Sequence, residues 1–298
     1  MSLTVRGIIK IPDGQDTDFD HAAFDARTRR VFVAHTARGL LEVIDHDASR
    51  HIATLKGFPE AAGVVAHDGH VLVTNRGAAS VAWVDAASLQ TRSVWTTAPR
   101  PNGVAITFAA TLGIAACIGD ATHGPELQSF ELATGRQSTL KLPGRPRWCV
   151  TSADDTRIFL AIREPSTVLV ARLPDLGDVQ HWPLPSGGAH GLDIDHAGNR
   201  LYVACDDKAL VEVDIGTGKS QRQWPLDGGP DATFFNPASG IVHVAIGDPG
   251  LVQSVDPNTG SVSKIATARG AGTTALVAPD RLYVLSPSHG GILELTGA

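Results

Sequence analysis

The chain has 298 residues, of which 43% are hydrophobic and 19% are charged, so it carries enough apolar side chains for a substantial core. The formal net charge is −6, and lysine and arginine are dispersed along the chain rather than gathered into the basic patch of a nucleic-acid-binding protein. Three cysteines without a CxxC pair indicate neither a disulfide framework nor a structural zinc site. These features argue against a nucleic-acid partner.

The N-terminus and the longest apolar segment bear on cellular location. The first residues lack the basic start, apolar core and small-residue cleavage site of a signal peptide. Residues 104–118 form the longest apolar run, which is shorter than the roughly 20 residues of a membrane-spanning helix. We therefore expect a cytoplasmic protein with no membrane partner, and the sequence leaves its oligomeric state open.

The predicted elements are all strands. In chain order, a first strand at residues 3–12 precedes seven copies of a unit of about 40 residues. Each copy contains a strand rich in β-branched and aromatic residues, preceded by a turn-prone stretch. These seven strands lie at residues 29–35, 69–75, 112–118, 156–162, 199–205, 240–246 and 280–286. Another strand follows each of them, and in six copies a more polar strand comes next.

Four strands per unit of this length are typical of a propeller blade. The seventh unit stops after its third strand, at Leu295, and the strand at residues 3–12 resembles the polar fourth strands. Pairing the two ends of the chain would complete the last blade and remove an exposed sheet edge. The sequence therefore predicts an all-β, seven-bladed β-propeller with four antiparallel strands per blade, forming a single domain over residues 1–298.

Three motifs carry a resemblance to the YVTN-repeat propeller family over the whole chain. They are PNGVAIT at residues 101–107, VLVTN at 71–75 and VDPNTG at 255–260. The resemblance implies the propeller fold. It implies little about chemistry, because this fold supports many unrelated activities.

One polar residue per unit lies at the start of the predicted innermost strand, where the neighbouring positions are mostly apolar. Aligning the units on their second strands gives the set that we call the mouth residues: Asp20, Glu60, Asn102, Arg147, His190, Asp231 and Thr273. In a propeller these positions face the mouth of the central channel. They would line either a water-filled rim or a binding site.

The chemistry of the mouth residues suits a divalent cation. Glu60, Asn102 and Asp231 offer carboxylate and amide oxygens, which favour Ca²⁺, Mg²⁺ or Mn²⁺, and a histidine ligand would shift the preference toward Zn²⁺. We predict these three residues as metal ligands. Asp20, His190 and Arg147 are the predicted catalytic residues.

Loops next to the same positions supply candidate substrate-binding residues. His35, Asn75 and His289 lie at or near the ends of second strands, Trp148 follows Arg147, and Thr273 belongs to the mouth residues. Residues 117–125 form the longest of these loops and could cover the mouth.

The predicted site resembles, in style, that of gluconolactonase-family propellers, where Glu, Asn and Asp at the starts of inner strands hold a divalent ion. The segments PNG, with Asn102, and PDA, with Asp231, carry this resemblance. It implies a metal-dependent hydrolase that acts on a lactone or an ester-like small molecule. The ion would activate a water, Asp20 or His190 would take a proton, and Arg147 would hold an anionic substrate group. That family usually has six blades, and its opening EGP sequence is absent here.

Two other functions remain open. A propeller lyase similar to the streptogramin lyases would open a lactone by elimination, with His190 and either His35 or His289 as the base. A non-catalytic propeller would instead bind a small ligand or a protein. The chemical variety of the mouth residues favours an enzyme.

Overall fold

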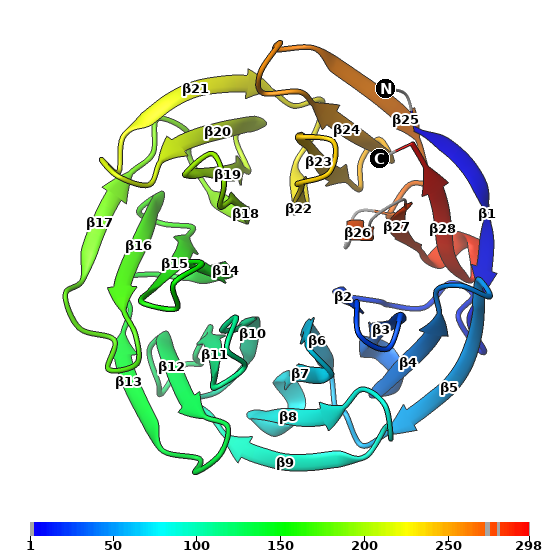
Figure 1. The fold of residues 1–298 in the computed structure, drawn as a ribbon, viewed down its shortest axis with the longest axis horizontal. Helices are drawn as coiled ribbons and strands as arrows, with labels where there is room; N and C mark the ends of the chain where they lie inside the picture. The colour runs from blue at the N-terminus through cyan, green and yellow to red at the C-terminus, as the bar shows by residue number, and fades with distance from the viewer. Residues whose placement is uncertain (1–2, 272–274, 279–280, 298) are drawn as a thin grey trace. The chain divides into compact units, whose positions relative to one another are not determined.

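The computed structural model describes residues 3–271, 275–278 and 281–297, and confirms the all-β prediction. These residues form seven four-stranded antiparallel sheets, so the chain is a seven-bladed β-propeller (Figure 1). Its backbone contacts divide it into two compact units: unit 1 is Met1–Phe19 with Leu184–Ala298, and unit 2 is Asp20–Pro183. The single-domain organisation stays a prediction.

Unit 2 holds the first four blades, each built from strands consecutive in sequence. The first blade contains β2 (Ala22–Asp25), β3 (Arg30–His35), β4 (Leu40–Asp45) and β5 (Arg50–Lys56). The second contains β6 (Ala61–His67), β7 (His70–Asn75), β8 (Ser80–Asp85) and β9 (Thr91–Thr96). The third contains β10 (Pro101–Ile106), β11 (Leu112–Cys117), β12 (Glu126–Glu131) and β13 (Gln137–Lys141). The fourth contains β14 (Pro146–Thr151), β15 (Arg157–Ile162), β16 (Thr167–Arg172) and β17 (Gln180–Pro183).

Unit 1 holds the other three blades. The fifth contains β18 (Ala189–Asp195), β19 (Arg200–Cys205), β20 (Ala209–Asp214) and β21 (Ser220–Pro225). The sixth contains β22 (Pro230–Asn236), β23 (Ile241–Ile246), β24 (Leu251–Val255) and β25 (Val262–Ala266). The seventh contains β26 (Ala275–Ala278), β27 (Arg281–Ser286), β28 (Gly291–Thr296) and β1 (Thr4–Lys10). Three short 3₁₀ helices follow second strands in the described chain: η1 (Thr36–Arg38), η2 (Arg76–Ala78) and η3 (Pro287–His289).

Closure of the last blade by the N-terminal strand is confirmed. β1 pairs antiparallel with β28, from Thr4 opposite Thr296 to Lys10 opposite Gly291. The pairing covers the edge of β28, as the count of strands at the two chain ends predicted.

Burial explains why each kind of strand has its own sequence pattern. The second and third strands pack on both faces, so β15 and β19 read as continuous apolar runs that are buried along nearly their whole length. The fourth strands have one outward face, and β13 and β25 alternate exposed with half-buried residues. Apolar side chains pack between neighbouring blades within each unit, as where Leu160 and Leu169 join Leu127 and Ile114.

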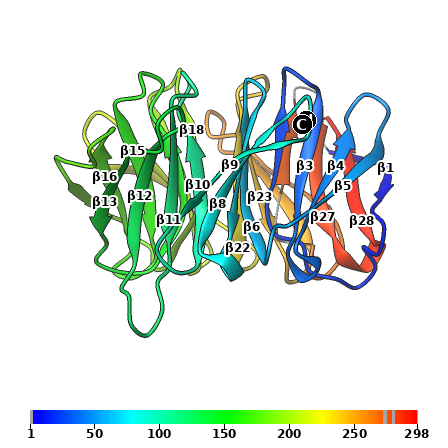
Figure 2. The same ribbon diagram turned by 90° about the horizontal axis from the view of Figure 1, so that it is seen from below.

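The strand register brings two kinds of loop to the same end of each blade. In the third blade, Pro101 at the start of β10 lies opposite Cys117 at the end of β11. The start of each inner strand therefore adjoins the loop that follows the second strand. The long loop at residues 118–125 projects beyond the strand ends of this blade (Figure 2). No helix among the described residues has the length and hydropathy needed to cross a membrane.

Candidate functional site

Four mouth residues belong to unit 2: Asp20, Glu60, Asn102 and Arg147. Glu60 directly precedes the first residue of the inner strand β6, and Asp20 lies two residues before the inner strand β2. Asn102 and Arg147 are each the second residue of their inner strand. Glycine allows neighbouring inner strands to approach closely, since a Cβ on Gly103 would lie 2.2 Å from the carbonyl oxygen of Arg147. The register of the repeat thus fixes these positions at one end of the unit.

The backbone around Asp20 is held by two blades. The amide of Asp20 donates to the carbonyl of Ala34 in β3, 3.0 Å away, and the amide of His21 donates to Ala62 in β6, 3.2 Å away. Both side chains are mostly buried, with 14% of the Asp20 side chain and 11% of the His21 side chain exposed. Nδ1 of His21 donates to Oδ1 of Asp20 across 2.5 Å. The pair is therefore a histidine oriented by a carboxylate.

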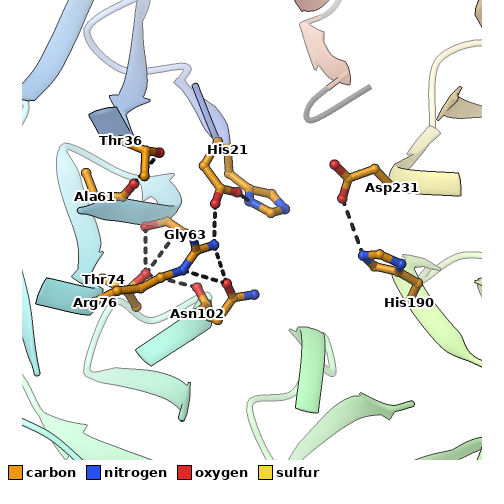
Figure 3. Close-up of polar contacts among 10 residues, drawn as sticks. His21, Thr36, Ala61, Gly63, Thr74, Arg76, Asn102, His190 and Asp231 are labelled. Carbon is orange, nitrogen blue, oxygen red and sulfur yellow. Dashed lines mark hydrogen bonds and ion pairs between the residues drawn. The ribbon is translucent and has the colours of Figure 1, made fainter. Parts of the chain in front are cut away.

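Arg76 joins this pair to the third blade. Its Nη2 donates to the other oxygen of Asp20, Oδ2. Its Nε and Nη2 donate to Oδ1 of Asn102, at 3.0 and 2.5 Å (Figure 3). Oγ1 of Thr74 donates a hydrogen bond to the carbonyl oxygen of Asn102, 2.9 Å away. The guanidinium group therefore lies between a carboxylate and an amide oxygen.

His21 also contacts the fourth blade. Its ring stacks on Trp148, with centroids 4.1 Å apart and planes only 5° from parallel. His21 and Trp148 each follow a mouth residue directly, and the residues at the same place in the two intervening blades are Ala61 and Gly103. These small residues leave room for the two rings to meet. We call Asp20, His21, Arg76, Asn102 and Trp148 the Asp20 cluster.

The Asp20 cluster keeps its carboxylate ionised. Burial opposes the ionisation of Asp20, but the adjacent His21 and the guanidinium of Arg76 outweigh that effect and lower its pKa to about 2. The cluster thus combines an imidazole, a carboxylate that fixes its orientation, and a cation within hydrogen-bonding distance of that carboxylate.

Two mouth residues of unit 1 form a separate group. Nδ1 of His190 lies 2.8 Å from Oδ1 of Asp206, the residue after β19, and its Nε2 lies 3.5 Å from Oδ1 of Asp231 in β22 (Figure 3). Asp206 is held by its own amide, which donates to the carbonyl of Gly188. This imidazole therefore lies between two carboxylates.

Asn102, one of the three predicted metal ligands, is engaged by a guanidinium group. Oδ1 of Asn102 accepts both N–H groups from Arg76, so the guanidinium occupies the oxygen that a cation would need. Glu60 is exposed and Asp231 belongs to unit 1, beside His190. Within residues 3–271, 275–278 and 281–297, no three His, Cys, Asp or Glu side chains converge as a ligand set. The metal site stays a prediction.

The predicted substrate-binding residues are spread over different environments. His35 is fully buried and bonds Oε1 of Glu42 inside the first blade, at 2.9 Å. Asn75 is 2% exposed and donates to Ser80 within the second blade. His289 is half-buried in η3, where Nδ1 bonds the hydroxyl of Ser286. Trp148 alone of this set joins the Asp20 cluster. Thr273 lies outside the described residues.

Sequence reasoning missed His21 and the position of Arg76. His21 lies one residue beyond the aligned mouth position, where the other units carry mainly small apolar residues. That break in the repeat pattern was the available signal. Arg76 lies in the turn after β7, and nothing in the spacing alone indicates that its side chain reaches Asp20 in another blade.

Comparisons with known proteins show the fold alone. No protein-family model and no curated protein sequence matches the chain, so both family resemblances stay predictions. A streptogramin B lyase structure superposes with a TM-score of 0.83 at 11% identity, over 99% of this chain and 98% of that one. Hydrazine synthase of Kuenenia stuttgartiensis superposes with a TM-score of 0.70 at 14% identity, over 85% of this chain and 84% of that one. Both superpositions show the propeller fold, which supports many unrelated activities.

Proposed function

We propose that this protein is an enzyme that opens an ester or lactone bond in a small molecule by general-base catalysis. The observation that carries the proposal is the Asp20–His21 pair with Arg76 beside it. A histidine whose Nδ1 donates to a buried carboxylate has its lone pair on Nε2, where it can take a proton. Stacking on Trp148 limits rotation of that ring.

In hydrolysis, Nε2 of His21 takes a proton from a water as its oxygen attacks the carbonyl carbon. Negative charge then develops on the carbonyl oxygen. Nη1 of Arg76 makes no hydrogen bond with the described residues and is the group that would donate to this oxyanion. Collapse of the intermediate breaks the carbon–oxygen single bond, and the leaving oxygen recovers the proton from His21.

Elimination is the second candidate, supported by the fold that the chain shares with a streptogramin B lyase. Here Nε2 would take a proton from carbon rather than from water, and the carbon–oxygen bond would break to give a new double bond. The same base and the same guanidinium group serve both reactions. They differ in the source of the proton and in the bond that breaks: hydrolysis breaks the acyl carbon–oxygen bond, whereas elimination breaks the alkyl carbon–oxygen bond and releases the carboxylate.

Product analysis in ¹⁸O-labelled water separates these reactions. A panel of lactones and esters is incubated with the protein, and the products are examined by mass spectrometry. Hydrolysis places ¹⁸O in the new carboxylate, whereas elimination gives an unlabelled product with a double bond. Failure of the wild-type protein to open any member of the panel would instead favour a non-catalytic binding propeller.

Treatment with a chelator tests the predicted divalent ion on the same panel. Since Arg76 occupies the oxygen of Asn102, we expect the turnover rate to be unchanged after chelation and dialysis. Loss of activity that added Mg²⁺, Ca²⁺, Mn²⁺ or Zn²⁺ restores would return Glu60, Asn102 and Asp231 to the role of metal ligands.

A further inference from the structure

The side-chain amide of Asn102 has one end bound and the other end open. Its Oδ1 accepts hydrogen bonds from Nε and Nη2 of Arg76, at 3.0 and 2.5 Å. Its Nδ2 makes no hydrogen bond with any described residue, and it is not one of the buried polar atoms that lack a partner. Although only 8% of Asn102 is exposed, this nitrogen is therefore within reach of solvent.

The chemistry of Arg76 fixes the orientation of this amide. A guanidinium group has donors and no acceptor, so an amide beside it must present its oxygen rather than its nitrogen. Turning the Asn102 amide over would place N–H groups against N–H groups. Thr74 holds the backbone of the same residue, since its Oγ1 donates to the carbonyl oxygen of Asn102. Nδ2 therefore points away from Arg76 (Figure 3).

The open amide and Nη1 of Arg76 face different parts of a substrate. The guanidinium group is planar, with Nε and Nη2 on one edge and Nη1 at the opposite corner. Because Oδ1 of Asn102 lies on the edge formed by Nε and Nη2, Nη1 lies on the far side of the group from the amide. The two donors therefore bind two different oxygens, which are several bonds apart in the substrate.

The open amide belongs to the same chain of hydrogen bonds as the proposed base. Nη2 of Arg76 donates both to Oδ1 of Asn102 and to Oδ2 of Asp20. The other oxygen of Asp20, Oδ1, accepts from Nδ1 of His21. One guanidinium nitrogen and one carboxylate thus separate the amide from the imidazole. A small molecule that contacts His21 is close enough for a second group to contact Asn102.

The open end of the amide determines what kind of group it binds. Nδ2 carries N–H groups and no lone pair that could accept, so its partner must be an acceptor such as a carbonyl or ether oxygen. A bound substrate displaces water from this nitrogen, and a donor left without a partner is unfavourable. A molecule with an oxygen at this place is therefore preferred over one with a methylene group there.

From this geometry we infer that Asn102 determines specificity: its Nδ2 binds a second oxygen of the substrate, a carbonyl or ether oxygen several bonds from the ester group that opens. The inference rests on the proposed function, because His21 and Arg76 place the ester. It narrows the substrate class to esters and lactones that carry such an oxygen. Since the contact is the same before and during the reaction, it lowers KM and leaves kcat unchanged.

Two esters that differ only at the second oxygen test the inference. Ethyl levulinate carries a ketone where ethyl pentanoate has a methylene group. For the wild-type protein we expect kcat/KM to be about 10-fold higher with ethyl levulinate, through KM. Asn102→Asp keeps the oxygen that Arg76 bonds and replaces the N–H groups by a second oxygen, so it should abolish the preference. Asn199→Asp, the same exchange at an exposed turn residue, should keep it.

Side-chain ¹⁵N NMR gives a second readout that does not depend on turnover. The probes are N-ethyl levulinamide and N-ethyl pentanamide, the amides that correspond to the two esters. The Nδ2 resonance of Asn102 is identified by its absence from the spectrum of Asn102→Asp. We expect it to shift saturably with the levulinamide and not with the pentanamide.

The two readouts separate this inference from the proposed function. A specific shift without opening of any ester would contradict the proposed function and support binding by Asn102. Absence of the shift, or an equal shift with both amides, would overturn the role of Asn102 even if the protein opens esters. So would an unchanged preference for ethyl levulinate in Asn102→Asp, and in that case the role of His21 as general base would stand.

Discussion

Replacing Asp20 by asparagine should destabilise the protein in a way that depends on pH. The substitution keeps the shape of the side chain but removes the negative charge between His21 and Arg76. The pKa of Asp20 falls from 3.8 to about 2 in the folded protein. That difference of roughly 1.8 pH units corresponds to about 2.5 kcal/mol of folding free energy, at about 1.4 kcal/mol per unit.

The sign of the effect fixes the pH range for the assay. Because the pKa of Asp20 is lower in the folded than in the unfolded chain, its stabilising contribution is complete above pH 4 and is lost as the pH falls toward 2. Urea unfolding at pH 7 should give a free energy of unfolding about 2.5 kcal/mol lower for Asp20→Asn than for wild type. The difference should hold down to pH 4 and shrink at pH 3.

A control substitution separates this effect from a general loss of charge. Asp68→Asn removes a carboxylate whose side chain is 65% exposed and whose ion pair with Arg27 spans 3.8 Å, so its effect should be within about 0.5 kcal/mol of zero. Equal stability of Asp20→Asn and wild type at pH 7 would refute the reasoning. So would a difference that stays constant from pH 7 to pH 3.

Three further predictions concern buried titratable groups. Burial lowers the pKa of His243 to about 4, so the unfolded chain binds the proton more readily than the folded one. As the pH falls from 6.5 to 4, the free energy of unfolding measured by urea titration should therefore fall roughly 3 kcal/mol less for His243→Gln than for wild type. Burial raises the pKa of Asp193 from 3.8 to about 7 in the folded protein, so its contribution to stability falls as the pH rises from about 4 to 7. Asp193→Asn should therefore gain roughly 2 kcal/mol at pH 8, about half of the full value because the residue is half-buried and partly screened by solvent, and nothing at pH 4; equal gains at both values would contradict this. Burial raises the pKa of the thiols of Cys117 and Cys149 to about 12, so a thiol reagent at pH 8 should label them only after denaturant is added, and rapid labelling of the native protein would show that they are accessible.

The fold was predictable because its determinants are local and repeated. Each second strand is a short apolar run bounded by turn residues, as Arg200–Cys205 and Arg157–Ile162 illustrate. Seven repetitions of such a pattern fix the number of blades. The incomplete seventh unit then requires the pairing of β1 with β28 that the structure shows.

The candidate site was predictable only in part, because side-chain direction is not a property of the repeat. The alignment identified Asp20 and Asn102, which do come together, but through the guanidinium of Arg76. Nothing in the spacing shows how far the Arg76 side chain reaches across blades. His35 is a residue that the sequence wrongly favoured by position alone: it ends a strand near the site, but its side chain bonds Glu42 inside the blade.

The specificity constant kcat/KM of His21→Gln tests the central claim most directly, measured on whichever lactone or ester the wild-type protein opens. His181→Gln on the exposed β17 serves as the control. If His21 is the general base, its replacement should lower kcat/KM at least about 100-fold while the control stays at the wild-type value. A His21→Gln protein that is folded and as active as wild type would contradict the account.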